Sequence, residues 1–190
     1  MIEYASQTKD APLSRIPLDH DEPATLIEVY EQVVARHPKP DTLNYKSGGA
    51  WASVSAAEML NRARHIAAGL HSLGVRKGDR VAILSDSRLE WVLADQGCVL
   101  LGAVAVPIYP TLTAAQVAYI VNDCAARAIF VANEEKLKQV QTALTNCASI
   151  QQVVLLDAGD PGILNLKSLE AAGSRALDES PDLLSRLAQE

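Results

Sequence analysis

The chain has 190 residues and a mass of 20.4 kDa; 48% of the residues are apolar and 21% are charged. This balance is typical of a globular domain with a buried core, and it excludes a disordered, collagen-like or disulfide-stapled protein. The 17 basic and 23 acidic residues give a formal net charge of −6. We expect no nucleic-acid partner, because binding to a phosphate backbone depends on clustered basic side chains.

The three cysteines, Cys98, Cys124 and Cys147, are far apart and form no C-x-x-C pair. This spacing indicates neither a zinc site nor a disulfide framework, and Cys98 and Cys124 lie in apolar helical patterns where a thiol packs as a small hydrophobic group. The sequence does not open on a signal peptide, and its longest apolar run, 98–107, is too short to span a bilayer. These features predict a soluble, cytoplasmic protein.

The N-terminal part is rich in proline. Residues 1–23 predict an extended arm that lies on a surface or at a partner interface. A helix is expected over 25–37, ended by the sequence HPKP. Two short strands, 42–46 and 50–55, joined by Ser47-Gly48-Gly49, predict a hairpin. The helix has an apolar stripe formed by Leu26, Val29, Tyr30, Val33 and Val34.

Apolar, strand-like runs alternate with helical patterns through the rest of the chain. The runs are residues 81–84, 103–108, 127–132 and 152–157. Strands that are apolar on both faces and separated by amphipathic helices predict a parallel sheet with helices on each side. The expected fold is therefore an α/β three-layer sandwich with a mostly parallel, doubly wound sheet. The arm, one helix and a small β-hairpin precede it.

Capping patterns mark the predicted helix starts. Capping boxes are expected at Ser55–Glu58, Ser87–Glu90 and Thr113–Gln116, and Asn133 is expected to cap the helix that follows it. Ser180-Pro181 predicts the start of a last helix, with proline at the first helical position.

Polar side chains follow the carboxyl ends of the predicted strands, where open α/β sheets bind ligands. They are Ser85, Asp86 and Ser87; residues 107–111; Asn133 and Glu134; and Asp157, Gly159 and Asp160. None of these turns has the glycine pattern of a dinucleotide site or a P-loop. Asp86, Glu134 and Asp157 could converge on a metal, but each also suits a helix start or a turn, which we favour.

No catalytic group is evident among the histidines or aromatic residues. His65 is expected on the solvated face of its helix with Asn61 and Arg62. No histidine stands beside a nucleophile, and no G-x-S-x-G elbow is present. The four histidines are His20, His37, His65 and His71, and the aromatic residues interpreted as core or interface groups are Trp51, Trp91, Tyr109 and Tyr119.

Residues from about Leu26 to Leu144 resemble the N-terminal part of adenylate-forming enzymes, especially long-chain acyl-CoA synthetases. WASVSAAEML, with Glu58, is similar to their first motif. LGVRKGDRVAILSDSRLEWVLADQGCVLLGAVAVPIYPT is similar to the G-V-x-x-G-D-x-V strand entry, the S-x-x-R-x-E-W helix and the G-A-x-x-V-P-I-Y-P-T motif. Tyr109, Pro110 and Thr111 favour the fatty-acyl branch, whereas Ser87 stands where many relatives have asparagine.

The resemblance implies a fatty acid–CoA ligase. In such a ligase, a fatty carboxylate attacks the α-phosphate of Mg-ATP to give an acyl adenylate and pyrophosphate, and coenzyme A then displaces AMP. The phosphate-binding loop, the nucleotide contacts, the acyl tunnel and the C-terminal lysine domain would follow Glu190 by family order. Residues 24–190 are therefore expected to be the N-terminal α/β subdomain, truncated before that loop and inactive alone. We assign no catalytic, cofactor-binding or metal-binding residue to it.

Three hypotheses follow. The favoured one is a fragment of a ligase that uses ATP, Mg²⁺ and coenzyme A, and the partner of the fragment is the remainder of the ligase chain. The ligase is expected in the cytoplasm, with at most a peripheral association with the membrane. The second is a stand-alone α/β binding or regulatory module. The third is a subdomain that forms a homodimer through the N-terminal region. An exposed apolar edge is expected if a larger protein covers part of this surface.

Overall fold

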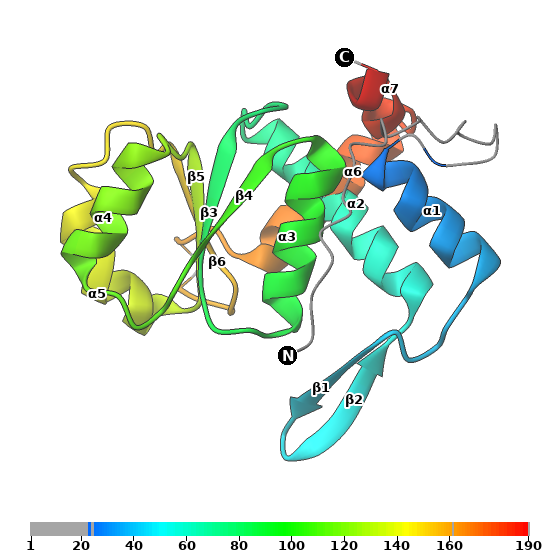
Figure 1. Ribbon diagram of the computed structural model, residues 1–190, viewed down its shortest axis with the longest axis horizontal. Helices are drawn as coiled ribbons and strands as arrows, with labels where there is room; N and C mark the ends of the chain where they lie inside the picture. The colour runs from blue at the N-terminus through cyan, green and yellow to red at the C-terminus, as the bar shows by residue number, and fades with distance from the viewer. Residues whose placement is uncertain (1–22, 24, 161, 190) are drawn as a thin grey trace, which may run out of the picture.

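The computed structural model describes residues 23, 25–160 and 162–189 (Figure 1). The predicted arm, residues 1–23, lies outside them except for Pro23. In chain order the elements are α1 (Leu26–Arg36), β1 (Leu43–Ser47), β2 (Ala50–Val54), α2 (Ala56–Ser72), β3 (Arg80–Leu84), α3 (Leu89–Leu101), β4 (Val104–Ile108), α4 (Ala114–Asp123), β5 (Ala128–Val131), α5 (Glu134–Leu144), β6 (Gln152–Leu155), α6 (Leu166–Glu179) and α7 (Leu183–Gln189).

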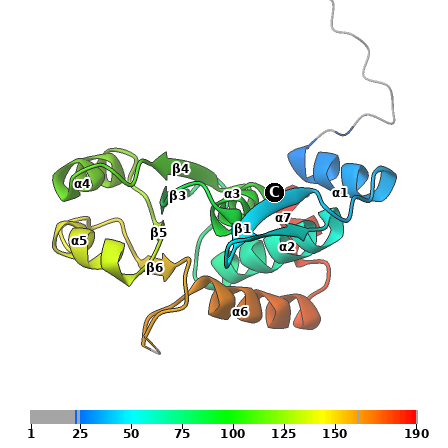
Figure 2. The same ribbon diagram turned by 90° about the horizontal axis from the view of Figure 1, so that it is seen from below.

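The main sheet has four parallel strands in the order β4-β3-β5-β6. Helices α4 and α5 cover one face, and α2, α3 and α6 cover the other (Figures 1 and 2). The predicted three-layer α/β sandwich with a parallel, doubly wound sheet is confirmed. Each of the four predicted runs forms a strand, with ends that differ by no more than two residues.

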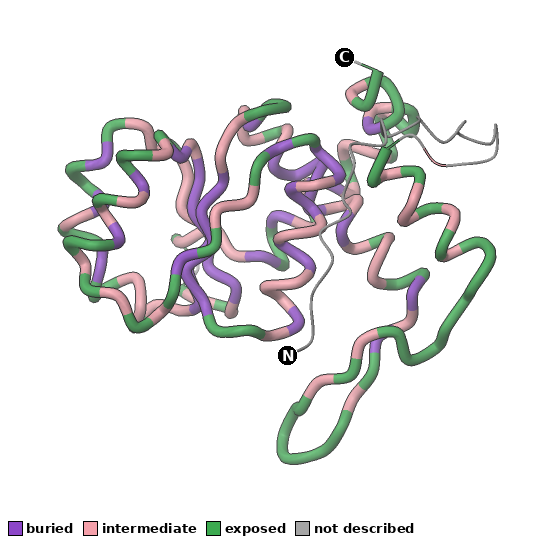
Figure 3. The backbone as a smooth tube through the Cα atoms, in the orientation of Figure 1, coloured by how far each residue is buried: buried purple, intermediate pink, exposed green. Residues whose placement is uncertain are grey.

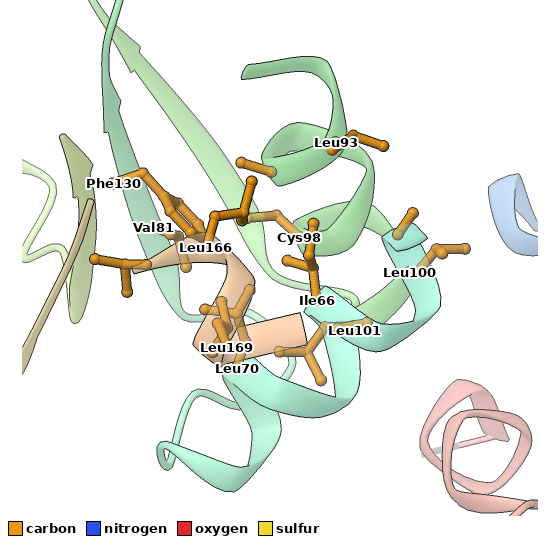
Figure 4. Close-up of a cluster of buried hydrophobic side chains, with 14 of the residues drawn as sticks. Ile66, Leu70, Val81, Leu93, Cys98, Leu100, Leu101, Phe130, Leu166 and Leu169 are labelled. Carbon is orange, nitrogen blue, oxygen red and sulfur yellow. The ribbon is translucent and has the colours of Figure 1, made fainter. Parts of the chain in front are cut away.

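The two central strands supply both hydrophobic cores. Every residue of β5 is fully buried, and so are the last four of β3, because helices cover both faces (Figure 3). Val81, Ile83 and Phe130 face the first core, where Figure 4 shows Phe130 and Val81 beside side chains of α2, α3 and α6. Leu84 and Ile129 face the second core, against α4 and α5. This two-sided burial explains why these strands read as continuous apolar runs.

The predicted hairpin forms outside the main sheet. Strands β1 and β2 pair in antiparallel fashion, with Leu43 opposite Val54 and Ser47 opposite Ala50. Gly48 and Gly49 connect them with φ of 58° and 85°. Two consecutive positive φ angles are the requirement of a type I′ turn, which glycine meets without steric cost.

Helix α6 was not predicted, and its position overturns one prediction. It packs along α2, and Arg62 of α2 donates a hydrogen bond of 2.9 Å from Nη2 to Oε1 of Glu170. The face of α2 that carries Arg62 and His65 was expected to be solvated. Both residues are only partly exposed, because α6 covers that face.

The predicted caps hold at three positions. The side chains of Ser55, Thr113 and Asn133 accept hydrogen bonds from backbone amides in the first turns of α2, α4 and α5, and at Thr113 the full capping box with Gln116 is present. The Ser87–Glu90 box is wrong: Arg88 is the N-cap of α3, with no side-chain cap bond, and Glu90 pairs with Arg88 instead.

Two details of the outer helices also differ from expectation. Helix α1 packs through Ile27 and Tyr30, which lie on the same face, whereas Leu26 and Val33 of the predicted stripe are 60% and 49% exposed. The last helix begins at Leu183 rather than at Pro181, because Ser180 ends α6. Within the described residues, no helix combines the length and the hydropathy needed to cross a membrane.

Candidate functional site at the carboxyl edge of the sheet

The strand order creates a switch point at the carboxyl edge. Strands β3 and β5 are neighbours, but the chain leaves β3 toward β4 on one side and leaves β5 toward β6 on the other. Ligands of open α/β sheets bind where connections diverge in this way. Ser85 and Asp86 follow β3, and Asn133 and Glu134 follow β5, so these predicted candidates do lie at the edge.

Arg88 joins two loops at this edge. Its Nη2 lies 2.6 Å from Oδ1 of Asp157, which follows β6, and its Nε lies 2.5 Å from Oε2 of Glu90. Burial lowers the pKa of Arg88, but the hydrogen bonds and charges of Glu90 and Asp157 outweigh it and raise that pKa above its usual value. Arg88 therefore stays charged and holds the start of α3 against the end of β6.

The first turn of α5 makes a second set of loop contacts. Oε1 of Glu134 accepts a hydrogen bond of 2.6 Å from the backbone N–H of Asp160. Lys136 donates from Nζ to the carbonyl of Pro110, at 2.9 Å, and its own backbone N–H is capped by the side chain of Asn133. These contacts tie together the loops that follow β4, β5 and β6.

Two of the three acidic candidates, Glu134 and Asp157, thus hold loops in place, whereas Asp86 is exposed. Asp157 is paired with Arg88 and Glu134 is bonded to the backbone at Asp160, in keeping with the structural role that the sequence favoured. Across the part of the chain that the structure describes, His, Cys, Asp and Glu side chains form no group of three or more that could hold a metal ion. The bond between Arg88 and Asp157 joins residues 69 positions apart, so spacing could not reveal it.

A groove of about 580 Å³ lies beside this edge, between the hairpin and the first turn of α3. Tyr45 and Leu43 of β1 line one side, and Arg88 and Val92 line the other. Lys46 also lines it, with its Nζ 5.5 Å from the ring centre of Trp51. The groove therefore has a mixed apolar and charged wall.

The three cysteine side chains are buried or half-buried. Cys98 and Cys147 are buried and free, and burial raises the pKa of both, so neither is poised as a thiolate. Cys124 is half-buried at the end of α4, where its Sγ lies 3.6 Å from the carbonyl oxygen of Val121.

The described histidines lie on α1 and α2, whereas Tyr109 directly follows β4 at the carboxyl edge. His37 is the exposed C-cap of α1, His65 and His71 are partly buried on α2, and His20 lies outside the described residues. Trp91 packs against the first core, as expected. The other three aromatic residues are not core groups; they are exposed on the surface: Trp51 by 71%, Tyr109 by 79% and Tyr119 by 70%.

Fold and edge together define an open, doubly wound α/β unit in which Arg88, Glu134 and Lys136 at the strand ends stabilise loops. Over residues 30–183 the chain matches the family described as AMP-binding enzyme. It is 33% identical over 172 residues to the long-chain-fatty-acid–CoA ligase FadD15 of Mycobacterium bovis, covering 90% of this chain and 27% of that protein. The chain belongs to the AMP-binding enzyme family, and the resemblance to long-chain fatty acid–CoA ligases is confirmed.

Two further comparisons bear on fold and length. The crystal structure of the anthranilate CoA ligase AuaEII in complex with anthranoyl-AMP superposes with a TM-score of 0.68 at 25% identity, covering 80% of this chain and 29% of that one. The uncharacterized protein Rv1549 of Mycobacterium tuberculosis is 25% identical over 141 residues, covering 74% of this chain and 77% of its own length. The chain spans about a quarter of the length of these ligases, 27% of FadD15 and 29% of AuaEII.

Proposed function

We propose that this chain is the N-terminal part of an ATP-dependent long-chain fatty acid–CoA ligase and is inactive alone. The observation that carries the proposal is the match over 90% of the chain to a ligase of which it spans 27%. The outer strand β4 has no strand on its free side within the described residues, and Val104 and Pro107 on it are exposed; the proposal assigns the covering of this free edge to the remainder of the ligase.

The whole ligase would join a fatty acid to coenzyme A through an acyl adenylate, with ATP and Mg²⁺. The acidic side chains described here do not converge, and Arg88 is already paired, so they do not fit a nucleotide–metal site. We assign to this chain a supporting role: its sheet and its fastened loops hold the carboxyl edge in place. The nucleotide and thiol chemistry would come from the remainder of the ligase, in the cytoplasm.

A chimaera tests this proposal. The matching region of FadD15 is replaced by this chain, and formation of acyl-CoA from a long-chain fatty acid, ATP and coenzyme A is measured beside intact FadD15 and the isolated chain. We expect the chimaera to keep activity within about tenfold of FadD15, a loss of at most about 1.4 kcal/mol in transition-state stabilisation. We expect the isolated chain to form no acyl-CoA.

Two controls make the result interpretable. FadD15 without the matching region shows whether activity needs this part at all, and circular dichroism of the chimaera shows whether it folds. A folded chimaera with no activity would contradict the assignment, and turnover by the isolated chain would contradict its inactivity.

A second candidate is a stand-alone binding or dimerisation module. It is favoured by Rv1549, a relative of which this chain covers 77%, so that a chain of similar length exists in the family. This hypothesis expects self-association or ligand binding by the isolated chain without turnover. Molar mass in solution separates a dimerisation module from a monomeric fragment.

A further inference from the structure

The groove beside the hairpin runs along the free edge of its first strand. The hairpin extends past the ends of α1 and α2 (Figures 1 and 2). All five residues of β1, Leu43–Ser47, line the groove, whereas none of the described residues of β2 does. Within the described part of the chain, β2 is the only strand beside β1. The other edge of β1 therefore faces the groove, with the first turn of α3 across from it.

The groove leaves an apolar side of the hairpin only partly covered. Leu43 and Tyr45 point to the same side of β1, because they are two residues apart, and both are half-buried. Val92 of α3 lines the opposite wall and is half-buried as well. A two-stranded hairpin is marginally stable in water, whereas three strands with an apolar face are stable. The edge strands β4 and β6 differ in this respect, because helices already cover both faces of their four-stranded sheet.

The groove also carries one uncompensated positive charge. Arg88 is paired with Glu90 and Asp157. Lys46 has no ion pair within the described residues; its Nζ lies over the ring of Trp51. A lysine on an edge strand discourages pairing with a second copy, which brings the same charge, and favours a strand that brings an acid. The groove therefore fits an extended segment with apolar and acidic side chains.

We infer that an extended segment from the remainder of the ligase lies in this groove and adds a third strand to the free edge of β1. Its apolar side chains would contact Tyr45 and Val92, and one of its carboxylates would pair with Lys46. The chain spans 27% of FadD15 and 29% of AuaEII, so most of such a ligase is available to supply the segment. Extended segments commonly bind by backbone pairing at a sheet edge. The inference rests on the proposed function, because it takes its partner from the ligase.

A zero-length cross-link in the chimaera with FadD15 tests the contact at Lys46. A carbodiimide joins a lysine amine to a carboxylate that touches it, and mass spectrometry of the digest identifies the linked pair. We expect Lys46 to be linked to an aspartate or glutamate of the FadD15 part in about tenfold higher yield than Lys138, because a carboxylate held beside the amine reacts faster than one that must diffuse to it. Lys138 is an exposed residue of α5 that does not line the groove. Lys46→Arg should lose the link, because a guanidinium does not couple.

Hydrogen exchange measures the pairing at the edge of β1. Amides of β1 should exchange at least about tenfold more slowly in the chimaera than in the isolated chain, because the added strand closes the free edge. In the chimaera, Lys46→Gln should speed this exchange by about two- to fivefold, the effect of losing one exposed ion pair. Lys46→Arg, which keeps the charge, and Lys138→Gln should leave the slow exchange unchanged. Circular dichroism shows that each variant is folded.

Three results would overturn the inference. In a folded chimaera, these are the absence of a link from Lys46 to the FadD15 part, or exchange of β1 as fast as in the isolated chain. The third is a Lys46 link between two copies of the isolated chain, which would assign the groove to a second copy. None of these readouts depends on turnover. A folded chimaera that shows the link and the slow exchange but forms no acyl-CoA would contradict the proposed function and support the assignment of the groove.

Discussion

Asp95 lies half-buried in the middle of α3, near Tyr30 of α1. Burial raises the pKa of Asp95, and burial together with the charge of Asp95 raises the pKa of Tyr30. A carboxyl whose folded pKa exceeds its unfolded value destabilises the fold once it ionises. The cost is absent below the unfolded pKa of about 3.9, grows as the pH rises through the folded pKa, and is complete above it.

We predict that Asp95→Asn raises the free energy of unfolding near pH 7 and that the gain disappears near pH 4. Asparagine and aspartate have similar helix propensities, so the difference reports the charge. After discounting for solvent screening of a half-buried group, the gain is about 0.5 kcal/mol. Urea unfolding at both pH values measures it. The matched substitution Asp41→Asn, in the exposed loop before β1, should show no such gain, and an equal loss of stability at both pH values would refute the prediction.

At the scale of elements, glycines set the distance between α2 and α6. A Cβ at Gly173 would lie 1.7 Å from the carbonyl oxygen of His65 and 2.7 Å from the backbone N of Gly69. Both are backbone atoms, so the neighbour cannot rotate away and the helices would have to separate. We predict that Gly173→Ala lowers the free energy of unfolding by about 2 to 3 kcal/mol.

Urea unfolding of Gly173→Ala against Gly162→Ala measures this effect. Gly162 has open space around its Cβ position, so the control should change stability by less than about 0.5 kcal/mol. A Gly173→Ala variant as stable as the control would show that α6 can shift without loss of packing.

The same two helices show what the sequence can and cannot predict. The parallel sheet was predictable because β3 and β5 are apolar on both faces, and the caps at Thr113 and Asn133 are local patterns. Helix α6 was predictable in part: Asn165 and Ser168 form a capping box, but Gly173 lowers helix propensity in its interior. That glycine serves the close approach to α2, and a long-range contact of this kind leaves no local signal.

The edge site, too, was predictable from the sequence only in part. Its position followed from strand order and the polar residues at strand ends, whereas the partners of its side chains did not. The pairing of Arg88 with Asp157 depends on β6 lying near the start of α3, and the expected box at Ser87 assumed a local partner for Glu90. Tertiary packing decided the first contact, whereas Glu90 does have a local partner, which is Arg88 in place of Ser87.

At the scale of the whole molecule, the described residues form two hydrophobic cores that share strands β3 and β5, and the hairpin β1–β2 is attached to the first core. Because the shared strands face both cores, neither core can open without them, and we expect their amides to exchange only through global unfolding. Strands β1 and β2 rest on the body through a few side chains, such as Leu43 and Tyr45. They can therefore open locally while the sandwich stays folded.

We predict that, in dilute solution, amides of β1 and β2 exchange with solvent deuterium at least about a hundredfold faster than amides of β3 and β5, which corresponds to a difference of about 2.7 kcal/mol in opening free energy. Mass spectrometry of hydrogen exchange on peptides from each segment measures the rates. Gly173→Ala should accelerate exchange in β3 and β5, because it lowers global stability, and should leave the hairpin rates nearly unchanged. Equal rates in the hairpin and the central strands would mean that the hairpin is an integral part of the folding unit.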